Sequence, residues 1–438
     1  MKVMKFGGTS VGSAIRMKGV VDLINDGETK IVVLSAMSGT TNALIEFTNY
    51  LRNGNTIGAI EHITNLQSKY RQTIKELYSD EKYAAMANEK VGEIFNHLRS
   101  LAAQPLTSDN EKEIVAQGEM MSTNMVTIYM AEQGIKSALL NSLDFMRLKA
   151  NEEPDMEYLA ANLNPLIESR TDGKTYIAQG FICMNSENRI DNLQRGGSDY
   201  TATLIGAAVQ AEEIQIWTDI DGMHNNDPRI VEGTRPVRHL QFEESAELAY
   251  FGAKILHPTC ILPAKLAGVP VRLLNTMDPK AEGTLIDNNL TEPGTIKAIA
   301  AKDNITAIKI KSGRMLLAYG FLRKVFEIFE SYRTSIDMIC TSEVGVSMSI
   351  DNTNRLEEIT NELQKYGTVT VDKNMCIICV VGNLTWENTG FESRAMEAMK
   401  DIPVRMVSYG GSNYNISFLI RMEDKEKALR ALSKQIFN

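Results

Sequence analysis

The 438-residue chain has few cysteines and no long apolar segment. Its five cysteines are odd in number, which indicates free thiols in a reducing compartment rather than a disulfide framework. Cys376 and Cys379 form a CxxC pair, but they lie in an apolar run that predicts a buried strand with core thiols. No apolar run is long enough to cross a bilayer, and a predicted strand starts too close to Met1 for a signal peptide. We therefore expect a cytoplasmic protein with no membrane partner.

Several catalytic motifs are also absent. The sequence contains no GxxxxGK(S/T) and no GxGxxG after a strand, so neither a P-loop nor a dinucleotide-binding turn is predicted. HExxH is missing and the five histidines are scattered, so we expect no metal site built by the protein. The net charge of −9 argues against a nucleic-acid partner. What remains is Lys, Arg, Asp, Glu, Ser and Thr on glycine-rich turns, which suits phosphoryl transfer without a P-loop.

The chain opens on a short apolar run, Val3 to Phe6, which predicts a strand that ends in the turn Gly7-Gly8-Thr9-Ser10. Two glycines let backbone N–H groups approach a ligand closely, and the ammonium of Lys5 beside them favours an anion. The alternative is an ordinary strand-to-helix turn, where glycine and serine are common. The turn by itself leaves both interpretations open.

Strands and helices then alternate along the chain. Residues 42–133 carry apolar side chains at helical spacing, and residues 200–210 predict a further helix. Further strands are predicted at 30–36, 137–141, 175–182, 213–218 and 269–274. This alternation predicts an α/β domain with a mostly parallel sheet sandwiched by helices, in which ligands bind beyond the carboxyl ends of the strands. Gly7-Gly8, the segment Ser35 to Thr41, and Asp219 fall at such ends.

One carboxylate interrupts a mostly apolar helical segment. Glu119 is surrounded by Ile114, Val115, Met120 and Met121. A single glutamate on a helix usually faces solvent, but these neighbours indicate partial burial, where an acid needs a partner.

The composition becomes polar and rich in turns at 287–294, which predicts a domain boundary after residues 1–294. Beyond it, a βαββα pattern of about seventy residues occurs twice. Ile336-Asp-Met-Ile aligns with Val404-Arg-Met-Val. The first copy has its elements at 305–311, 321–332, 336–350 and 356–365, and the second at 375–381, 391–399, 404–420 and 425–437. We therefore expect two small α+β modules, at 295–371 and 372–438.

Six motifs resemble those of aspartate kinase and occur in that family's order. They are Lys5-Phe-Gly-Gly-Thr-Ser10, Gln179-Gly-Phe-Ile182, Arg195-Gly-Gly-Ser-Asp-Tyr-Thr201, Trp217-Thr-Asp219, Asp227-Pro-Arg229 and Gly252-Ala-Lys-Ile-Leu-His-Pro258. Each is short, but the six together are highly specific, and the resemblance covers essentially the whole chain. It implies the amino acid kinase fold followed by two ferredoxin-like ACT modules. It also implies phosphorylation of the β-carboxylate of L-aspartate by ATP with Mg²⁺, the step that opens lysine, threonine and methionine synthesis.

The resemblance assigns roles at the matching positions. Lys5, Gly8 and Asp199 would be catalytic, because the Lys5 ammonium can offset charge growing on the phosphoryl oxygens while Asp199 orients Lys5 or the metal. Arg195 would pair with the α-carboxylate of aspartate, and Glu119 with its α-ammonium group. The other implied substrate contacts are Ser35, Thr41 and Ser198. The nucleophile is already ionised, so no strong general base is required.

For the nucleotide, the resemblance implies a longer list of contacts. These are Lys5, Gly7, Gly8, Thr9, Ser10, Thr218, Asp219, His224, Asp227, Arg229 and Lys254. Mg²⁺ would be held mainly by ATP oxygens, with a carboxylate and waters. The chain departs from the family at Cys183, Gln194 and His224, where Gly, Gly and Tyr are usual, so the nucleotide contacts depend on these positions.

The first ACT module resembles the lysine site of lysine-inhibited aspartate kinases. The matching positions are Met315, Gly320, Phe321, Leu322, Ser335, Ile336, Asp337, Thr341, Ser342 and Glu343. Asp337 and Glu343 would pair with an ammonium group, although both acids could instead lie on a solvated strand edge. The second copy has Arg405 in place of Asp337 and Gly410-Gly411 in place of Ser342-Glu343, which predicts one effector module per chain.

We expect feedback inhibition by L-lysine, with threonine as the second choice of effector. A homodimer that pairs the ACT modules would couple them to the active site, and pairing of dimers into tetramers stays open. Two other functions compete with this one. Another carboxylate kinase is disfavoured because Glu119 and Arg195 imply a substrate with both an ammonium and an α-carboxylate group. An amino-acid sensor with an inactive kinase domain is disfavoured because every candidate charged residue is present.

Overall fold

The computed structural model describes residues 1–169, 174–193, 196–252, 256–289, 293–313 and 319–437. These residues form two compact units, each described here by itself. Unit 1 comprises Met1–Gly222 and Leu256–Asn288, and unit 2 comprises Met223–Ile255 and Asn289–Asn438. The units differ from the predicted domain ranges, because Met223–Ile255 clusters with the C-terminal modules and unit 2 resumes at Asn289 rather than at residue 295.

Unit 1 is built on a mostly parallel sheet, as predicted. Within the unit the strand order is β3-β4-β2-β1-β7-β9-β10. β2 reads Lys-Ile-Val-Val-Leu and is buried along its whole length, as expected of a strand covered on both faces. The strands are β1 (Lys2–Phe6), β2 (Lys30–Leu34), β3 (Ser137–Leu140), β4 (Thr175–Gln179), β7 (Glu213–Thr218), β9 (Val271–Asn275) and β10 (Thr284–Asp287). β1 pairs in parallel with β2 and with β7, which places Phe6 opposite both Leu34 and Trp217 at the carboxyl edge of the sheet.

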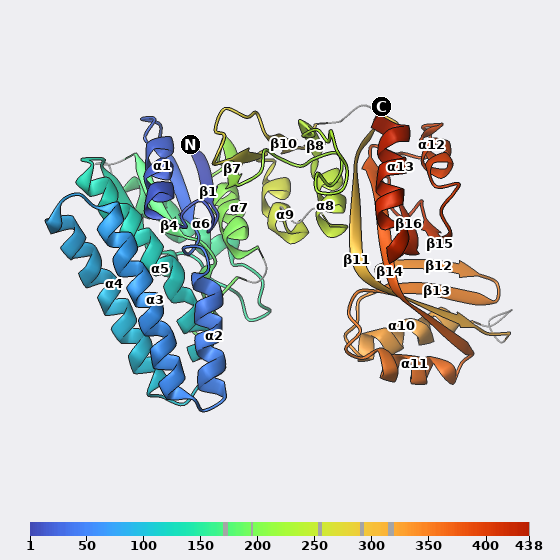
Figure 1. Cartoon of the computed structure of the whole chain (residues 1–438), viewed down its shortest axis with the longest axis horizontal. Helices are drawn as coiled ribbons and strands as arrows, with labels where there is room; N and C mark the ends of the chain where they lie inside the picture. Colours follow the sequence, from blue (N-terminus) through green and yellow to red (C-terminus); the bar gives the residue numbers. More distant parts are fainter. Residues whose placement is uncertain (170–173, 194–195, 253–255, 290–292, 314–318, 438) are drawn as a thin grey trace. The chain divides into compact units, whose positions relative to one another are not determined.

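Helices accompany this sheet, and four of them extend from it as a bundle (Figure 1). The bundle helices are α2 (Thr40–Arg52), α3 (Thr56–Leu77), α4 (Glu81–Ala102) and α5 (Ser108–Glu132), and the other helices of the unit are α1 (Ala14–Ile24), α6 (Met156–Glu168), α7 (Gly197–Ala208) and α9 (Pro258–Ala267). Side-chain caps divide the predicted helical region 42–133. The side chains of Asn55, Asp80 and Thr107 each accept a backbone N–H in the first turn of α3, α4 and α5. Phe47, Tyr70 and Phe95 are buried in the same core as Phe6 of β1.

One predicted strand is wrong at its end. Residues 175–182 do not form a single strand, because the chain turns between β4 and the short hairpin of β5 (Ile182–Met184) and β6 (Ile190–Asn192). The N–H of Gly180 still donates to the carbonyl of Leu34, but Phe181 adopts φ +69°, a left-handed conformation that ends a strand. The turn brings Gly180 to the carboxyl edge of the sheet.

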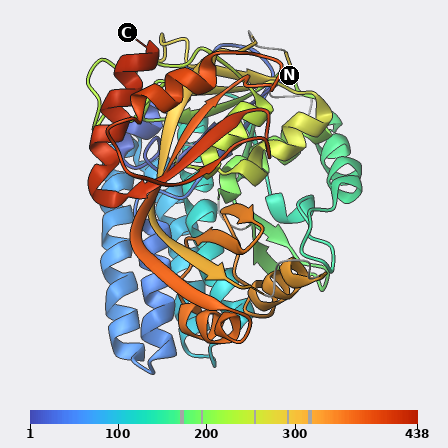
Figure 2. The ribbon, with the colours of Figure 1, turned by 90° about the vertical axis from the view of Figure 1, so that its right-hand side faces the viewer.

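Unit 2 contains a sheet with strand order β12-β13-β11-β14-β16-β15, in which the long strands β11 and β14 run antiparallel through both modules (Figures 1 and 2). Its strands are β8 (His239–Gln241), β11 (Ile296–Lys311), β12 (Met338–Ser342), β13 (Gly345–Ile350), β14 (Thr368–Gly382), β15 (Val404–Ser408) and β16 (Asn415–Arg421). Each long strand has an asparagine with positive φ near its middle, Asn304 at +61° and Asn374 at +56°. The β11–β14 register shifts beside both residues.

Two separate apolar cores lie at the two ends of these long strands. One core joins β11, β13, α10 (Phe321–Ser331) and α11 (Leu356–Gln364), and we call this part module 1. The other joins β14, β16, α12 (Phe391–Ala398) and α13 (Lys425–Phe437), and we call it module 2. The predicted βαββα elements are present, and Cys376 and Cys379 are buried in β14 as predicted. The two modules are nevertheless interleaved, because residues 296–302 of β11 pair with the β14 residues of module 2.

Unit 2 also contains α8 (Phe242–Tyr250), which follows β8 directly. The Glu244 carboxylate accepts the N–H of Gln241 and so stabilises the start of this helix. Among the described residues, no helix is long and apolar enough to cross a membrane.

Candidate active site

The ammonium of Lys5 forms the centre of a polar cluster at the carboxyl end of β1. Its Nζ lies 2.7 Å from Oδ1 of Asp199, and the side chains are only 10% and 13% exposed. Asp199 stands in the first turn of α7, which starts after Gly196 at φ +73°. Free N–H groups at a helix N-terminus favour negative charge, so this turn suits both the Asp199 carboxylate and an anionic ligand.

The glycines after β1 keep this end of the strand open. A Cβ added to Gly7 would lie 3.5 Å from Nζ of Lys5, and one added to Gly8 would lie 3.0 Å from the carbonyl oxygen of Ala36. Gly8 therefore allows the turns after β1 and β2 to approach closely. The neighbouring hydroxyls diverge from each other. Ser10 hydrogen-bonds Thr276 at 2.8 Å, while Thr9 is exposed to solvent.

Glu119 lies deeper in the same region, on α5. Its Oε1 accepts the N–H of Ala36 at 3.1 Å, while Oε2 is buried and has no hydrogen-bond partner in the described part of the chain. Burial raises the pKa of Glu119 to about 8, although the Ala36 hydrogen bond and the charge of Lys5 both oppose this rise. A buried carboxyl group with an unused oxygen can accept a cationic donor at little further cost. The predicted burial of Glu119 is confirmed.

Close packing brings α5 and α7 against the sheet edge. A Cβ on Gly118 would lie 2.8 Å from Cβ of Ala36, so this glycine lets Glu119 reach the turn after β2. Ser35 donates its hydroxyl to Oγ of Ser198 at 2.9 Å. A Cβ on Gly180 would lie 2.5 Å from that Ser198 side chain. Ser35 and Ser198, both predicted substrate contacts, therefore meet across the sheet edge.

The remaining predicted residues of unit 1 lie around this cluster. Gly7 donates its N–H to the carbonyl of Trp217 at 3.4 Å, so Thr218 and Asp219 follow β7 beside the turn after β1. The Thr218 hydroxyl contacts the backbone of Ile220, and Asp219 is exposed. Thr41 is half-buried at the start of α2.

Other predicted nucleotide contacts belong to unit 2. Asp227 and Arg229 pair with each other at 2.7 Å, and this partner keeps the pKa of Asp227 below its ordinary value. The Arg229 side chain is 82% exposed and so remains open to solvent. Nδ1 of His224 lies 3.0 Å from the hydroxyl of Thr234. Four further positions of interest, Gln194, Arg195, Lys254 and Met315, lie outside the described residues.

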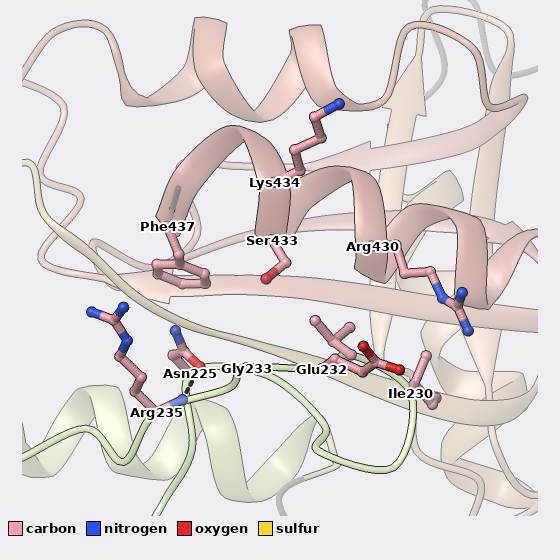
Figure 3. Close-up of a pocket in the computed structure, with 10 residues that line it drawn as sticks. Asn225, Ile230, Glu232, Gly233, Arg235, Arg430, Ser433, Lys434 and Phe437 are labelled. Atoms are coloured by element: carbon pink, nitrogen blue, oxygen red, sulfur yellow. Dashed lines mark hydrogen bonds between the residues drawn. The ribbon is translucent and has the colours of Figure 1, made fainter.

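The same segment of unit 2 borders a cavity of about 520 Å³ beside α13. Figure 3 shows that the side chain of Lys434 points away from the loop of Asn225 to Arg235, whereas Ser433 and Phe437 face it and Arg430 extends toward Ile230.

The predicted effector residues lie in module 1. Gly320 precedes α10 with φ +83°, Phe321 and Leu322 open that helix, and Ser335 and Ile336 precede β12. The structure does not bring Asp337 and Glu343 together within a single chain, and their pairing around one ammonium group stays a prediction. Asp337 stands before β12 and Glu343 after it, so the length of the strand separates them by about 20 Å. Thr341, Ser342 and Glu343 are exposed.

The interpretation of the sequence missed several residues that shape these sites. Ser122 donates its hydroxyl to the carbonyl of Ser35 and holds the turn after β2 against α5. Ser122 lies one helical turn from Glu119, and this spacing could have indicated that it faces the same site. Lys302 and Tyr250 contact Asp337, but they are remote in sequence and no local pattern links them to it.

The described residues contain no group of three or more His, Cys, Asp or Glu side chains arranged to hold a metal ion. The exposed carboxylate of Asp219 lies beyond β7, at the same sheet edge as Lys5. This arrangement fits a Mg²⁺ ion that takes most of its ligands from phosphate oxygens and water.

Comparisons with known proteins agree over the whole chain. The model of the amino acid kinase family matches residues 1–275, and an ACT domain model matches residues 378–436. Aspartokinase 1 of Arabidopsis thaliana, a chloroplastic protein, is 35% identical over 99% of this chain and 80% of its own length. The crystal structure of Escherichia coli aspartokinase III with lysine and aspartate, in the T-state, covers 100% of both chains with a TM-score of 0.83 and 32% identity. The R-state structure of that protein with aspartate and ADP covers 100% of both chains with a TM-score of 0.82 and 31% identity.

Proposed function

The chain belongs to the aspartokinase family, and we propose that it transfers the γ-phosphoryl group of ATP to the β-carboxylate of L-aspartate. The observation that carries this proposal is the cluster at the carboxyl edge of the unit 1 sheet. It combines the Lys5 ammonium, fixed by Asp199, with the buried carboxylate of Glu119. The complexes of the E. coli protein with aspartate and ADP support the same substrates for this chain.

In this reaction, an oxygen of the β-carboxylate attacks the γ-phosphorus and forms the new O–P bond. The bond from the γ-phosphorus to the bridging oxygen breaks, and that oxygen keeps the electron pair and leaves on ADP. The ammonium of Lys5 stabilises the charge on the transferred oxygens, and Asp199 positions it at 2.7 Å. The carboxylate nucleophile is ionised at neutral pH, so no side chain has to remove a proton.

Glu119 provides a place for the α-ammonium group of aspartate. The ammonium group would supply the partner that Oε2 lacks and would favour the ionised form of the carboxyl group. The contact between Arg195 and the α-carboxylate remains a prediction. Ser35 and Ser198 lie beside it and can donate hydroxyl hydrogen bonds.

For the nucleotide, we infer that the turn after β1 and the N-terminus of α7 bind phosphate oxygens. A bound Mg²⁺ ion would neutralise phosphate charge, and the exposed carboxylate of Asp219 would help to hold it. Thr218, His224, Asp227, Arg229 and Lys254 remain predicted contacts of ATP.

We further infer that L-lysine inhibits the enzyme through module 1 and that the chain forms a homodimer through its ACT modules. The lysine-bound T-state of the E. coli protein supports lysine as the effector. The domain boundaries at residues 294 and 371 and the cytoplasmic location remain predictions.

A coupled assay of purified protein tests the proposal. ADP release is followed with ATP and L-aspartate, and aspartyl phosphate is trapped with hydroxylamine. Lys5→Met removes the charge but keeps the stem, and turnover should fall by about 100-fold or more. The control is Lys2→Met on the same strand, whose ammonium pairs instead with Glu28. A wild-type protein that forms no aspartyl phosphate would favour the amino-acid sensor, and near-normal turnover of Lys5→Met would remove Lys5 from the mechanism.

A further inference from the structure

Three side chains of unit 2 surround the ammonium group of a fourth, Lys302. Nζ of Lys302, on β11, lies 2.7 Å from Oδ1 of Asp337 and 3.0 Å from Oδ2 of Asp351. The same ammonium lies 4.2 Å from the centre of the Tyr250 ring, within the range of a cation–π interaction. The Tyr250 hydroxyl donates to Oδ1 of Asp337 at 2.6 Å. Two carboxylates and an aromatic ring therefore surround a single primary ammonium group.

This cluster closes access to Asp337. The Asp337 side chain is 1% exposed and Lys302 is 17% exposed. Oδ2 of Asp337 is buried and has no hydrogen-bond partner in the described residues. An unpaired buried carboxylate is costly, so Asp337 needs a cation at this place. The ammonium group of Lys302 therefore occupies the position that another cation would take to pair with Oδ1 of Asp337.

Module 2 has a comparable ion pair with the charges exchanged. Lys302 and Asp372 each stand two residues before an asparagine with positive φ, Asn304 and Asn374. Arg405, which aligns with Asp337, pairs with Asp372 at 2.8 Å. In module 2 the acid of the pair, Asp372, therefore lies on the long strand β14, and the position equivalent to Asp337 carries the cation of Arg405. Only module 1 offers carboxylates to an ammonium group at this position.

We propose that Asp337, Asp351 and the Tyr250 ring form a binding site for a primary ammonium group, which Lys302 occupies until the ammonium group of a free amino acid displaces it. We call these residues the ammonium seat. The identity of the effector, L-lysine, rests on the proposed function, whereas the seat itself rests on the contacts of Lys302. Lysine carries the same group as the side chain that it replaces, so the chain contains its own competitor for the effector.

Competition predicts the direction of the effect. For an effector that binds only when Lys302 has left the seat, the apparent dissociation constant equals the intrinsic one divided by the fraction of protein in which the seat is vacant. Removal of the Lys302 ammonium removes this competitor. Lys302→Ala should therefore bind L-lysine at least tenfold more tightly than the wild-type chain, and inhibition should occur at correspondingly lower lysine concentration. The matched control is Lys309→Ala on the same strand.

The first experiment measures L-lysine binding to the full-length chains by isothermal titration calorimetry. A Lys302→Ala dissociation constant within twofold of wild type, or weaker, would overturn the proposal. Asp337→Asn provides a second variant that keeps both Lys302 and the shape of the seat. Its lysine affinity should fall about tenfold, and an unchanged affinity would contradict the seat even if Lys302→Ala proved too unstable to study.

A second experiment needs neither kinase activity nor lysine. Lys302→Ala lacks three carbons and the ammonium group, so n-propylammonium chloride can refill the seat. This salt should raise the thermal midpoint of Lys302→Ala more than sodium chloride of equal concentration does. In wild type and in Lys309→Ala, the two salts should change the thermal midpoint equally. Equal shifts in all three chains would refute the seat. Failure of the kinase assay with a positive result here would instead reject the proposed function and retain the ammonium seat.

Discussion

The buried carboxyl group of Glu119 makes a quantitative prediction about pH. Burial raises its pKa from the ordinary value of 4.5 to about 8. One pKa unit corresponds to about 1.4 kcal/mol, so the ionised carboxylate costs the ligand-free protein at most about 5 kcal/mol. The folded protein holds this proton more tightly than the unfolded chain does. The cost is therefore absent below pH 4.5, grows as the pH rises, and is complete above pH 8.

Glu119→Gln should remove this cost, because the amide oxygen can still accept the N–H of Ala36. At pH 9 the variant should have a larger free energy of unfolding than wild type, by several kcal/mol and at most about 5 kcal/mol. At pH 4.5 the two proteins should be nearly equal. Guanidinium unfolding at both pH values measures the difference. Glu89→Gln, at an exposed position of α4, is the control and should show no such pH dependence.

The same substitution should weaken the binding of aspartate. Loss of a charged hydrogen bond to the α-ammonium group is worth about 1.5–3 kcal/mol, so KM for aspartate should rise about 10- to 100-fold. Saturating aspartate should stabilise the wild-type chain at pH 9 and should stabilise Glu119→Gln much less. The reasoning is refuted if Glu119→Gln is less stable than wild type at pH 9, or if it keeps the wild-type KM for aspartate.

Two further predictions follow from the packing and the ligands of the site. Gly180→Ala places a methyl group 2.5 Å from the Ser198 side chain, so it should lower the free energy of unfolding by about 1–3 kcal/mol and reduce turnover. The control is Gly92→Ala on α4, where an added Cβ meets nothing within 4 Å. Equal stability and turnover of the two variants would contradict the close approach of Gly180 to Ser198. Chelation of Mg²⁺ should abolish aspartyl phosphate formation while leaving L-lysine affinity unchanged, because no metal ligand is needed in the ammonium seat. If calorimetry shows that chelation also abolishes L-lysine binding, the metal supports the effector site as well.

Local patterns in the sequence were sufficient for much of the fold. The apolar run of β2 and the glycine turn after β1 depend only on neighbouring residues, and the parallel sheet followed from their alternation with helices. The repeated βαββα pattern was visible for the same reason. The end of β4 could not be predicted in this way, because the left-handed turn at Phe181 depends on how the chain meets the sheet edge rather than on local propensity.

Candidate residues at the sheet edge could also be named from the sequence, since short motifs marked Lys5, Glu119 and Asp199. The contacts between these residues could not be predicted from the sequence. The 2.7 Å pair of Lys5 with Asp199 joins β1 to α7, and it exists because parallel strands bring distant turns to one edge. The burial that raises the pKa of Glu119 likewise comes from packing of α5 against the turn after β2.

The regulatory modules show the limit most clearly. The sequence by itself determined that there are two copies and that Asp337 has Arg405 as its counterpart. Only the tertiary structure decided that β11 spans both modules, that Glu343 lies at the far end of β12, and that Lys302 already fills the place beside Asp337. The physical reason is that periodicity reports which face of an element is buried, whereas pairing between charges depends on which elements the whole chain brings together.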